Sequence, residues 1–241
     1  MPERLRPLAL IASLVVGLPV AAWTQTRDEN WSRCSDMNPD LSIGACTALI
    51  QSGKETTDNL VLAFSNRGAS YARNRDYDRA FRDFDQAIRL NPNSERAIVS
   101  RGVIYGLKGD NDHSLQDYDH AIRLNPKSAI ALDNRCLLRA AMGRGQEALA
   151  DCDASLRINP TDTLALTNRG HAYLALKDYD AALSAYEVAV KADPVNPFAR
   201  FGRGVAKLRK GDVASGNADI TAAKVLQADV ADWMAKHGVK P

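Results

Sequence analysis

The stretch Asn66–Pro92, NRGASYARNRDYDRAFRDFDQAIRLNP, decides how this chain folds. A variant of it, SRGVIYGLKGDNDHSLQDYDHAIRLNP, ends at Pro126, 34 residues further along, and two more prolines follow at the same spacing. Self-similarity at a fixed spacing of this length is typical of proteins built from stacked structural repeats. Aligned on these prolines, the chain divides into five units: residues 61–94, 95–128, 129–162, 163–196 and 197–230.

Each unit contains two amphipathic patterns of helical period, separated by a short turn. Asp76, Asp110 and Asp178 stand at these turns, where an aspartate can accept hydrogen bonds from the free N–H groups of the following helix. The closing proline cannot continue a helix, and it moves the residue before it out of the helical region. We therefore expect two antiparallel helices in each unit and a break at each proline.

Small residues recur where the two helices of a unit would touch. They occupy the eighth position (Gly68, Gly102, Cys136, Gly170, Gly204) and the twentieth position (Ala80, Ser114, Ala148, Ala182, Gly216). Bulky residues such as Phe64 and Tyr71 fill the space between them. One such hairpin cannot bury its apolar face alone, so the units are expected to stack on one another.

This spacing of small and bulky residues resembles the tetratricopeptide repeat (TPR), and the resemblance covers roughly residues 61–230. It implies an all-α fold, a right-handed superhelical solenoid of antiparallel helix pairs. TPR proteins are typically scaffolds that hold a peptide or a partner protein on the concave face, and they usually lack catalytic residues. The last unit, residues 197–230, lacks the closing proline and is degenerate.

Charged residues depart from the TPR pattern in a regular way. The seventh position, usually apolar in the family, is arginine in every unit: Arg67, Arg101, Arg135, Arg169 and Arg203. The twenty-third position faces it across the hairpin and holds Asp83, Asp117, Asp151, Ala185 and Asp219. This arrangement predicts Arg–Asp pairs in four units and leaves Arg169 without that partner. The alternative is a ladder of arginines that binds an anionic ligand.

A peptide-binding groove is expected on the concave face, because the resemblance places positions two, five, six, nine and twelve of each first helix there. The candidate groove residues are Asn66, Arg96, Val99, Val103, Ile130, Asn134, Leu137, Leu164, Asn168, His171, Phe198 and Phe201. An asparagine amide carries both a donor and an acceptor, so it can bind the backbone of an extended peptide. The alternative is that the asparagines serve only the neighbouring backbone.

The two ends of the chain differ from the repeats. Residues 1–22 combine two arginines with a short apolar run and small residues before a cleavage site after Ala22, which predicts a signal peptide. The run is shorter than the roughly 20 residues of a spanning helix, which disfavours a retained membrane anchor. Residues 23–58 are interpreted as an irregular segment with one half-repeat helix, and residues 229–241 as an amphipathic cap.

Four cysteines predict two disulfide bonds. Cys136 replaces the glycine of position eight and Cys152 the aromatic residue of position twenty-four, so two departures from the pattern lie opposite each other in one hairpin. Cys46 aligns with Cys152, which leaves Cys34–Cys46 as the second pair. The alternative is four buried free thiols, which an exported chain disfavours. Neither pair has the C-x-x-C spacing of a redox catalyst, so we interpret both as structural.

Composition and motifs give little support to catalysis or nucleic-acid binding. The 31 basic and 29 acidic side chains leave a net charge of +2, without a clustered basic face. No phosphate-binding loop, nucleophile elbow or dinucleotide fingerprint occurs. His113, Asp117 and His120 share one helix face at a spacing that suits a metal, but Asp117 is the expected partner of Arg101. We therefore expect no catalytic residue, no metal site and no cofactor.

The sequence thus predicts an exported, soluble TPR scaffold of the bacterial periplasm. Its partner is expected to be a protein or peptide in the concave groove, and no membrane span is expected once the signal peptide is cleaved. One alternative is a self-assembling structural protein of the cell envelope, whose groove holds the terminus of another copy. An alternative of another class is an enzyme or a metal-binding protein, which would need a convergent nucleophile and base that the sequence does not offer.

Overall fold

A computed structural model of the chain describes residues 25–241, so the predicted signal peptide, residues 1–22, lies outside the described residues. Within residues 25–241 the chain forms thirteen α-helices and no strand. The helices are α1 (Arg27–Cys34), α2 (Pro39–Gln51), α3 (Thr57–Arg73), α4 (Tyr77–Leu90), α5 (Glu95–Leu107), α6 (Asn111–Leu124), α7 (Ala129–Ala141), α8 (Gly145–Ile158), α9 (Thr163–Ala175), α10 (Tyr179–Ala192), α11 (Pro197–Arg209), α12 (Val213–Leu226) and α13 (Val230–Lys236). None of these described helices is both long enough and apolar enough to cross a membrane.

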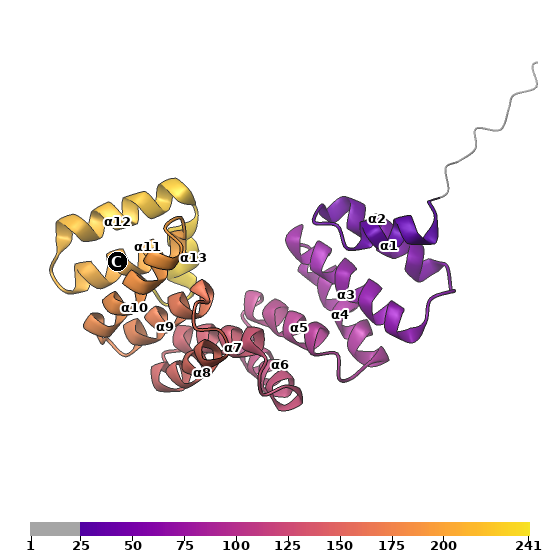
Figure 1. Cartoon of the computed structure of the whole chain (residues 1–241), viewed down its shortest axis with the longest axis horizontal. Coiled ribbons are helices and arrows are strands. Elements are labelled where there is room, and N and C mark those ends of the chain that lie inside the picture. Colours follow the sequence, from indigo (N-terminus) through magenta and orange to yellow (C-terminus); the bar gives the residue numbers. More distant parts are fainter. Residues whose placement is uncertain (1–24) are drawn as a thin grey trace, which may run out of the picture.

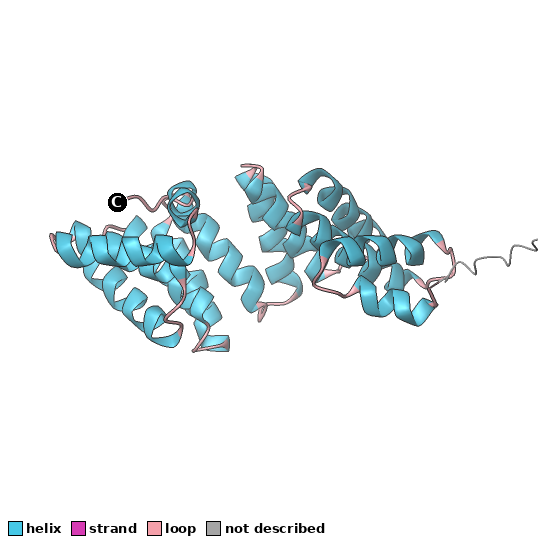
Figure 2. Ribbon diagram, turned by 90° about the horizontal axis from the view of Figure 1, so that it is seen from above, coloured by secondary structure: helices cyan, strands magenta, loops and turns pink. Residues whose placement is uncertain are grey.

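Five helix hairpins, from α3–α4 to α11–α12, stack one after another. From α5 onward, the first helix of each hairpin packs on both helices of the hairpin before it. The hairpins follow an arch, with α5 and α7 on its inner side and α6 and α8 on its outer side (Figure 1). Seen from above, the helices form one elongated row (Figure 2). This is the solenoid of antiparallel helix pairs that the sequence predicts, and first helices line its concave side.

The turn inside each unit is fixed by local chemistry. The side chains of Asp76, Asp110, Asp178 and Asp212 each accept a hydrogen bond from the backbone N–H three residues further on. These contacts confirm the predicted caps, whereas the third unit has Arg144 at this place and no side-chain cap. One residue earlier the backbone is left-handed in every unit, with glycine in three units and with Arg75 and Lys177 in the other two.

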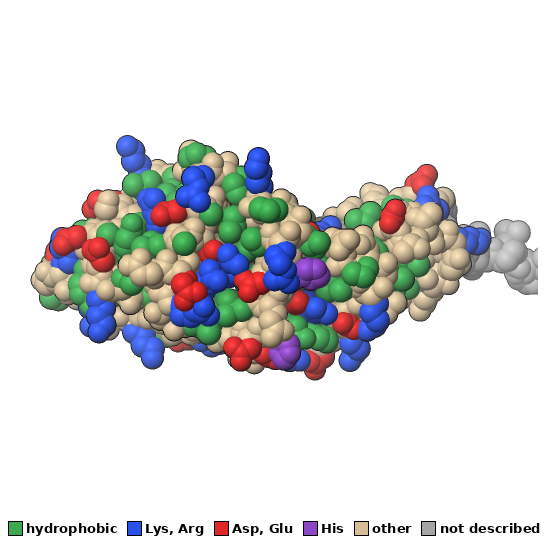
Figure 3. Space-filling model, turned by 90° about the horizontal axis from the view of Figure 1, so that it is seen from below, with side chains coloured by type: hydrophobic (Ala, Val, Ile, Leu, Met, Phe, Trp, Pro, Cys, Tyr) green, Lys and Arg blue, Asp and Glu red, His purple; other side chains and the backbone are tan. Residues whose placement is uncertain are grey.

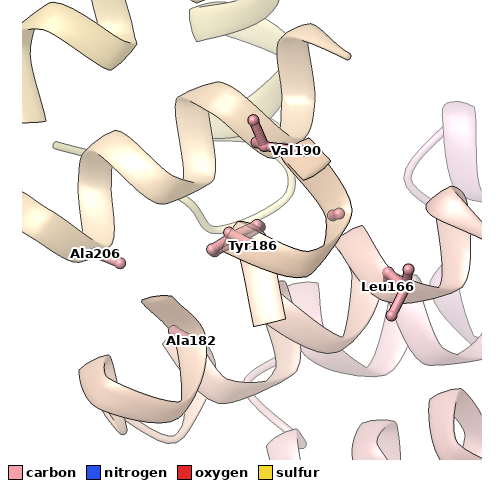
Figure 4. Packing of buried hydrophobic residues seen from close by; sticks show 7 residues of the cluster. Leu166, Ala182, Tyr186, Val190 and Ala206 are labelled. Atoms are coloured by element: carbon pink, nitrogen blue, oxygen red, sulfur yellow. The ribbon is translucent and has the colours of Figure 1, made fainter. Parts of the chain in front are cut away.

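Close approach of the two helices explains the glycines at the eighth position. A Cβ atom on Gly68 would lie 2.9 Å from the ring of Phe84, and one on Gly170 would lie 2.6 Å from the ring of Tyr186. Tyr186 belongs to a buried cluster that also contains Leu166 of the facing helix (Figure 4). A larger side chain at either glycine would force the second helix away from the first.

The predicted Arg–Asp pairs are present in four units. In each, Nε and Nη2 of the arginine donate to the two carboxylate oxygens of the aspartate, at 2.6 to 2.9 Å. The pairs are Arg67–Asp83, Arg101–Asp117, Arg135–Asp151 and Arg203–Asp219. Because these arginines are engaged inside the fold, they are not a free ladder for an anionic ligand.

Some of the same arginines also join neighbouring units through Nη1. These contacts are Arg101–Asp85 at 3.1 Å and Arg135–Asp119 at 2.6 Å. Arg169 is different, because Ala185 stands where the other units have aspartate. Its ion pair is a loose one with Asp153 of the preceding unit, 3.9 Å away, and its Nε has no hydrogen-bond partner among the described residues.

Both predicted cysteine pairs lie at bonding distance. The sulfur atoms are 2.03 Å apart in Cys34–Cys46 and 1.98 Å apart in Cys136–Cys152.

The Cys34–Cys46 pair joins α2 to a short helix, α1, which was not predicted from the sequence. A capping box of Thr26 and Glu29 begins α1 and was a visible signal for it. The helices α1 and α2 pack together as a hairpin ahead of the first repeat.

The C-terminal helix α13 packs on α11 and α12. Val230 and Met234 are buried in a cluster with Phe201 and Val205 of α11, so α13 lies on the concave side of the arch (Figure 1). The outer face of α12 stays open, and Val225 on that face is 82% exposed. The predicted capping helix is therefore present, but it covers the last unit from the inside of the arch.

Candidate functional site

The predicted groove residues form an open group and a covered group. In the open group, Ile130 is 60% exposed and Leu164 is 51% exposed. Arg96 is also exposed, while Val103 and Leu137 are half-buried. These side chains come from α5, α7 and the start of α9, and all of them except Arg96 are apolar.

The covered group consists of Val99 in α5 and of residues farther along the solenoid. The buried members of the predicted groove are Val99, Asn168, His171 and Phe201. Val99 is buried in the packing between the second and third units. Phe201 packs beneath α13, His171 lies 6.4 Å from Trp233 of α13 between ring centroids, and Phe198 lies 4.5 Å from the same ring. In this conformation the C-terminal end of the predicted groove is therefore occupied by the chain itself.

The three groove asparagines all bond within the chain. Asn168 is 1% exposed, and its Nδ2 donates to the main-chain oxygen of Asp133 in the preceding unit, 3.2 Å away. Asn134 donates to the main-chain oxygen four residues earlier in its own helix, at 2.7 Å. Nδ2 of Asn66 lies 3.8 Å from Sγ of Cys34. Asn168 thus serves the neighbouring backbone, while Asn66 and Asn134 are only half-buried.

Residues 228–241, which we call the C-terminal segment, are held by aromatic and main-chain contacts. Trp233 stacks on His237 with ring centroids 3.7 Å apart. Farther along, Nη2 of Arg209 donates to the main-chain oxygens of Lys240 and Pro241, both at 3.3 Å. A hollow of about 340 Å³ remains between this tail and the ends of α9 and α11.

Two buried side chains near α13, His171 and Tyr186, carry polar atoms without partners in the part of the chain that the structure describes, and we call these two side chains the floor of the groove. Within residues 25–241, neither ring nitrogen of His171 has a hydrogen-bond partner, and neither has the hydroxyl of Tyr186. The two rings meet edge to face, with centroids 5.7 Å apart. Burial, and to a lesser degree the nearby His237, lowers the pKa of His171 to about 3. Burial also raises the pKa of Tyr186 well above its usual value, so both side chains are neutral at neutral pH.

Tyr186 reaches the groove from α10 because two glycines make room for its ring. A Cβ atom would lie 2.6 Å from this ring on Gly170 and 2.3 Å from it on Gly202. Gly202 stands at the sixth position, where the first, third and fourth units have asparagine. The hydroxyl of Tyr186 therefore supplies a polar group near the place where those units have an amide. Sequence reasoning missed this residue, although the glycine at an asparagine position was a signal for it.

Two of the three residues considered for a metal site, His113 and Asp117, are engaged elsewhere. Asp117 binds Arg101 through both carboxylate oxygens. Nδ1 of His113 lies 2.8 Å from a carboxylate oxygen of Asp110, and its ring stacks on Tyr105. Within the described part of the chain, no three His, Cys, Asp or Glu side chains are placed to hold a metal ion together.

Charge is mixed on the surface of the solenoid. On the face in Figure 3, basic and acidic side chains lie interspersed among apolar ones. A nucleic-acid interface needs a face or stripe of clustered basic residues. The face in Figure 3 does not have that character.

The fold defines an α-helical solenoid with a concave face that holds a helix. Three family models, each described as tetratricopeptide repeat, match residues 61–94, 95–128 and 167–219. The chain belongs to the TPR family, whose members serve as scaffolds for protein–protein interaction and are generally not enzymes. No curated protein matches the sequence.

Solved structures show the same fold at low sequence identity. A TPR protein from Parabacteroides merdae is 18% identical, with a TM-score of 0.68 over 87% of this chain and 85% of its own. PilW, described as a widely conserved type IV pilus biogenesis factor, is 22% identical, with a TM-score of 0.64 over 73% and 85%. YrrB, described as a TPR protein with an unusual peptide-binding site, is 20% identical, with a TM-score of 0.55 over 78% and 94%.

Proposed function

We propose that this chain is a non-enzymatic scaffold that holds a peptide or a helical segment of another protein on its concave face. The observation that carries this proposal is the C-terminal segment, which already lies there through Val230, Trp233 and Met234. Recognition of an amphipathic helix in an apolar groove is a common mode of peptide binding. A surface that holds a helix of its own chain has the shape and the chemistry to hold one from another chain.

The open group of groove residues supports the same function. Ile130 and Leu164 expose apolar side chains on the first helices of the third and fourth units, and Val103 and Leu137 are partly accessible on those of the second and third units. Contiguous exposed apolar surface commonly marks an interaction site. A partner can therefore contact the open group without any rearrangement of the solenoid.

We further propose that the protein acts outside the cytoplasm, in a bacterial periplasm. The features of residues 1–22 that predict a signal peptide support this location. The two cysteine pairs at bonding distance support it as well, because disulfide bonds persist in oxidising compartments.

Site-specific photo-cross-linking in the cells that make the protein tests the binding face. A photoreactive residue at Leu137, on the concave side, is compared with one at Val188, which is exposed on α10. We expect a discrete adduct with another protein from Leu137 and none with that protein from Val188. Val103→Asp should lower the yield of the Leu137 adduct by about 5-fold or more, because the partner would bury an unpaired carboxylate.

Equal adducts from the two positions would contradict the concave face as the binding site. An adduct between two copies of this chain would favour the self-assembling alternative. Both results are read from the mass of the adduct and from its peptides.

Mass spectrometry of the protein purified without reductant tests the location. We expect a chain that begins at Trp23 and has no free thiol. Retention of residues 1–22, or four thiols that react with an alkylating reagent, would contradict export with oxidised cysteine pairs.

A further inference from the structure

The C-terminal segment matches the floor of the groove imperfectly. His171 is 2% exposed and Tyr186 is fully buried, yet three of their polar atoms have no partner within residues 25–241. The ring of Trp233 lies 6.4 Å from that of His171 between centroids, and Phe198 packs on Trp233 with centroids 4.5 Å apart. A buried polar atom without a partner lowers stability, because it loses its hydrogen bonds to water and gains none in return.

We propose that the C-terminal segment is a built-in ligand of a helix-binding groove, and that the partner is an amphipathic helix that displaces it and presents an acceptor oxygen to His171 and Tyr186. This inference rests on the proposed function and specifies the chemistry of its ligand. The amides and carboxylates of Asn, Gln, Asp and Glu supply such an oxygen, and so do the hydroxyls of Ser and Thr.

The buried apolar side chains of the segment define the apolar side chains that the partner helix must also present. Val230 and Met234 are buried one helical turn apart, and Val239 adds a third buried contact after the helix has ended. The partner differs at the position of Trp233, whose indole can donate a hydrogen bond but cannot accept one. The Tyr186 hydroxyl and the protonated ring nitrogen of His171 can both donate, so an acceptor oxygen from the partner would pair two of the three unpaired atoms.

The segment is attached in a way that permits displacement. The helix α13 has seven residues, and the side chain of its N-cap residue, Asp229, makes no capping hydrogen bond. A helix of this length is not stable alone in water, so it forms only while it is packed on the groove. A partner helix that offers the same anchors and one additional hydrogen bond replaces it without disturbing the repeats.

Binding of a labelled synthetic peptide with the sequence of residues 228–241, ADVADWMAKHGVKP, to the full chain tests the displacement. In the wild-type chain the tethered segment competes at an effective concentration on the order of 1 mM, so the peptide binds weakly. Met234→Asp places a carboxylate in the buried cluster and releases the segment. We expect peptide affinity, measured by fluorescence anisotropy, to rise about 10-fold or more.

Two further variants make this result specific. Val230→Asp is a second releasing variant, because Val230 is as fully buried as Met234. Val225→Asp adds the same charge on the exposed face of α12 and is expected to leave peptide affinity at the wild-type level. Far-UV circular dichroism confirms that each variant keeps its helices.

A peptide with the substitution W233Q tests the polar floor. Its affinity relative to the unmodified peptide is measured on the Met234→Asp chain, with and without Tyr186→Phe, which removes only the hydroxyl. We expect the ratio of the two association constants, that of the Gln peptide divided by that of the Trp peptide, to fall about 5-fold when the hydroxyl is removed. His171→Phe is expected to lower the ratio in the same direction.

Two outcomes overturn the inference. If Met234→Asp and Val230→Asp are folded and bind the peptide no better than wild type, the segment is not a displaceable ligand. If the ratio of affinities is unchanged by both Tyr186→Phe and His171→Phe, the floor does not select an acceptor. Either failure leaves the cross-linking result at Leu137 standing, so it is distinct from a failure of the proposed function.

Discussion

At the scale of single residues, Arg169 shows what the repeated Arg–Asp pair contributes. Its side chain is 29% exposed, and within residues 25–241 its one ion pair is with Asp153, at 3.9 Å. The corresponding arginines each bind an aspartate of their own unit through two hydrogen bonds. Bidentate pairs of this kind are stronger and more directional than single contacts. The fourth unit therefore lacks one tie between its two helices.

Ala185→Asp should supply this tie and raise the free energy of unfolding by about 1 kcal/mol, after the desolvation of the new carboxylate is offset. Ala185→Asn is the matched control, because it has the same size without the charge. Chemical denaturation of both variants at neutral pH measures the difference. An aspartate variant no more stable than the asparagine variant would show that the pair contributes nothing at this position.

His171 makes stability depend on pH. Its pKa in the folded chain, about 3, lies below the ordinary value of 6.5, so between these values the unfolded chain binds the proton more readily. The stabilisation from the neutral ring is complete above pH 6.5 and is lost as the pH falls. Asp133 acts in the opposite sense, because burial raises its pKa to about 6 and its protonation below that pH favours the folded chain.

The contribution of His171 is isolated by comparison with His171→Phe, because Asp133 titrates in both proteins. Between pH 7 and pH 5 the wild-type chain should lose about 2 kcal/mol more of its free energy of unfolding than the variant does. Urea denaturation of each protein at pH 7 and at pH 5 gives the two losses of free energy of unfolding. Identical losses in the two proteins would mean that His171 accepts its proton in the folded chain.

At the scale of the elements, the turn inside each unit requires a left-handed residue. Lys177 has a φ of 62°, at the position where the second, third and fifth units have glycine. Lys177→Gly should raise the free energy of unfolding by about 0.5 kcal/mol, because relief of backbone strain exceeds the entropy that glycine adds to the unfolded chain. Thermal and urea denaturation both report this change.

Gly143→Ala is the reciprocal variant of this prediction. A Cβ atom at Gly143 meets nothing within 4 Å, and its φ is 76°, so the substitution changes backbone strain alone. A loss of about 1 kcal/mol is expected. If neither Gly143→Ala nor Lys177→Gly changes the free energy of unfolding, the left-handed turn residue does not contribute to stability.

The repeated elements could be predicted from the sequence because each local signal agrees with the others. The caps at Asp76 and Asp110, the glycines at helix contacts and the closing prolines all indicate the same helix boundaries. The helix α1 was missed because eight residues carry little periodicity. The path of α13 was missed because it depends on contacts with α11 that lie far away in the sequence.

At the scale of the whole molecule, two cysteine pairs tie separate parts of the solenoid. Replacement of both Cys136 and Cys152 by alanine should lower the free energy of unfolding by about 3 kcal/mol, as expected for a closed loop of this size. The combination Cys136→Gly with Cys152→Phe copies Gly68 and Phe84 of the first unit and should recover part of the loss through packing. Chemical denaturation without reductant measures the free energy of unfolding of the wild-type chain and of both double variants. An alanine variant as stable as wild type would mean that this bond contributes no stability.

The candidate site could be predicted only in part, because the concave face follows from the repeat but its occupant does not. Positions on the first helices of the solenoid indicated Ile130 and Leu164, whose side chains are exposed, and Leu137, which is half-buried. The same rule indicated His171 and Phe201, which the C-terminal segment covers. Tyr186 was not predicted, since it comes from a second helix and has room for its ring only because Gly170 and Gly202 have no side chains.

The Cys136–Cys152 bond has a mechanical consequence. A solenoid drawn apart by its two ends can unravel unit by unit, because each unit contacts only its neighbours. The bond spans 16 residues of the third unit, which would otherwise extend by roughly 50 Å at about 3.4 Å per residue. Under tension the third unit therefore releases much less length than the units beside it, and it limits how far the molecule can be stretched while its cysteines stay oxidised.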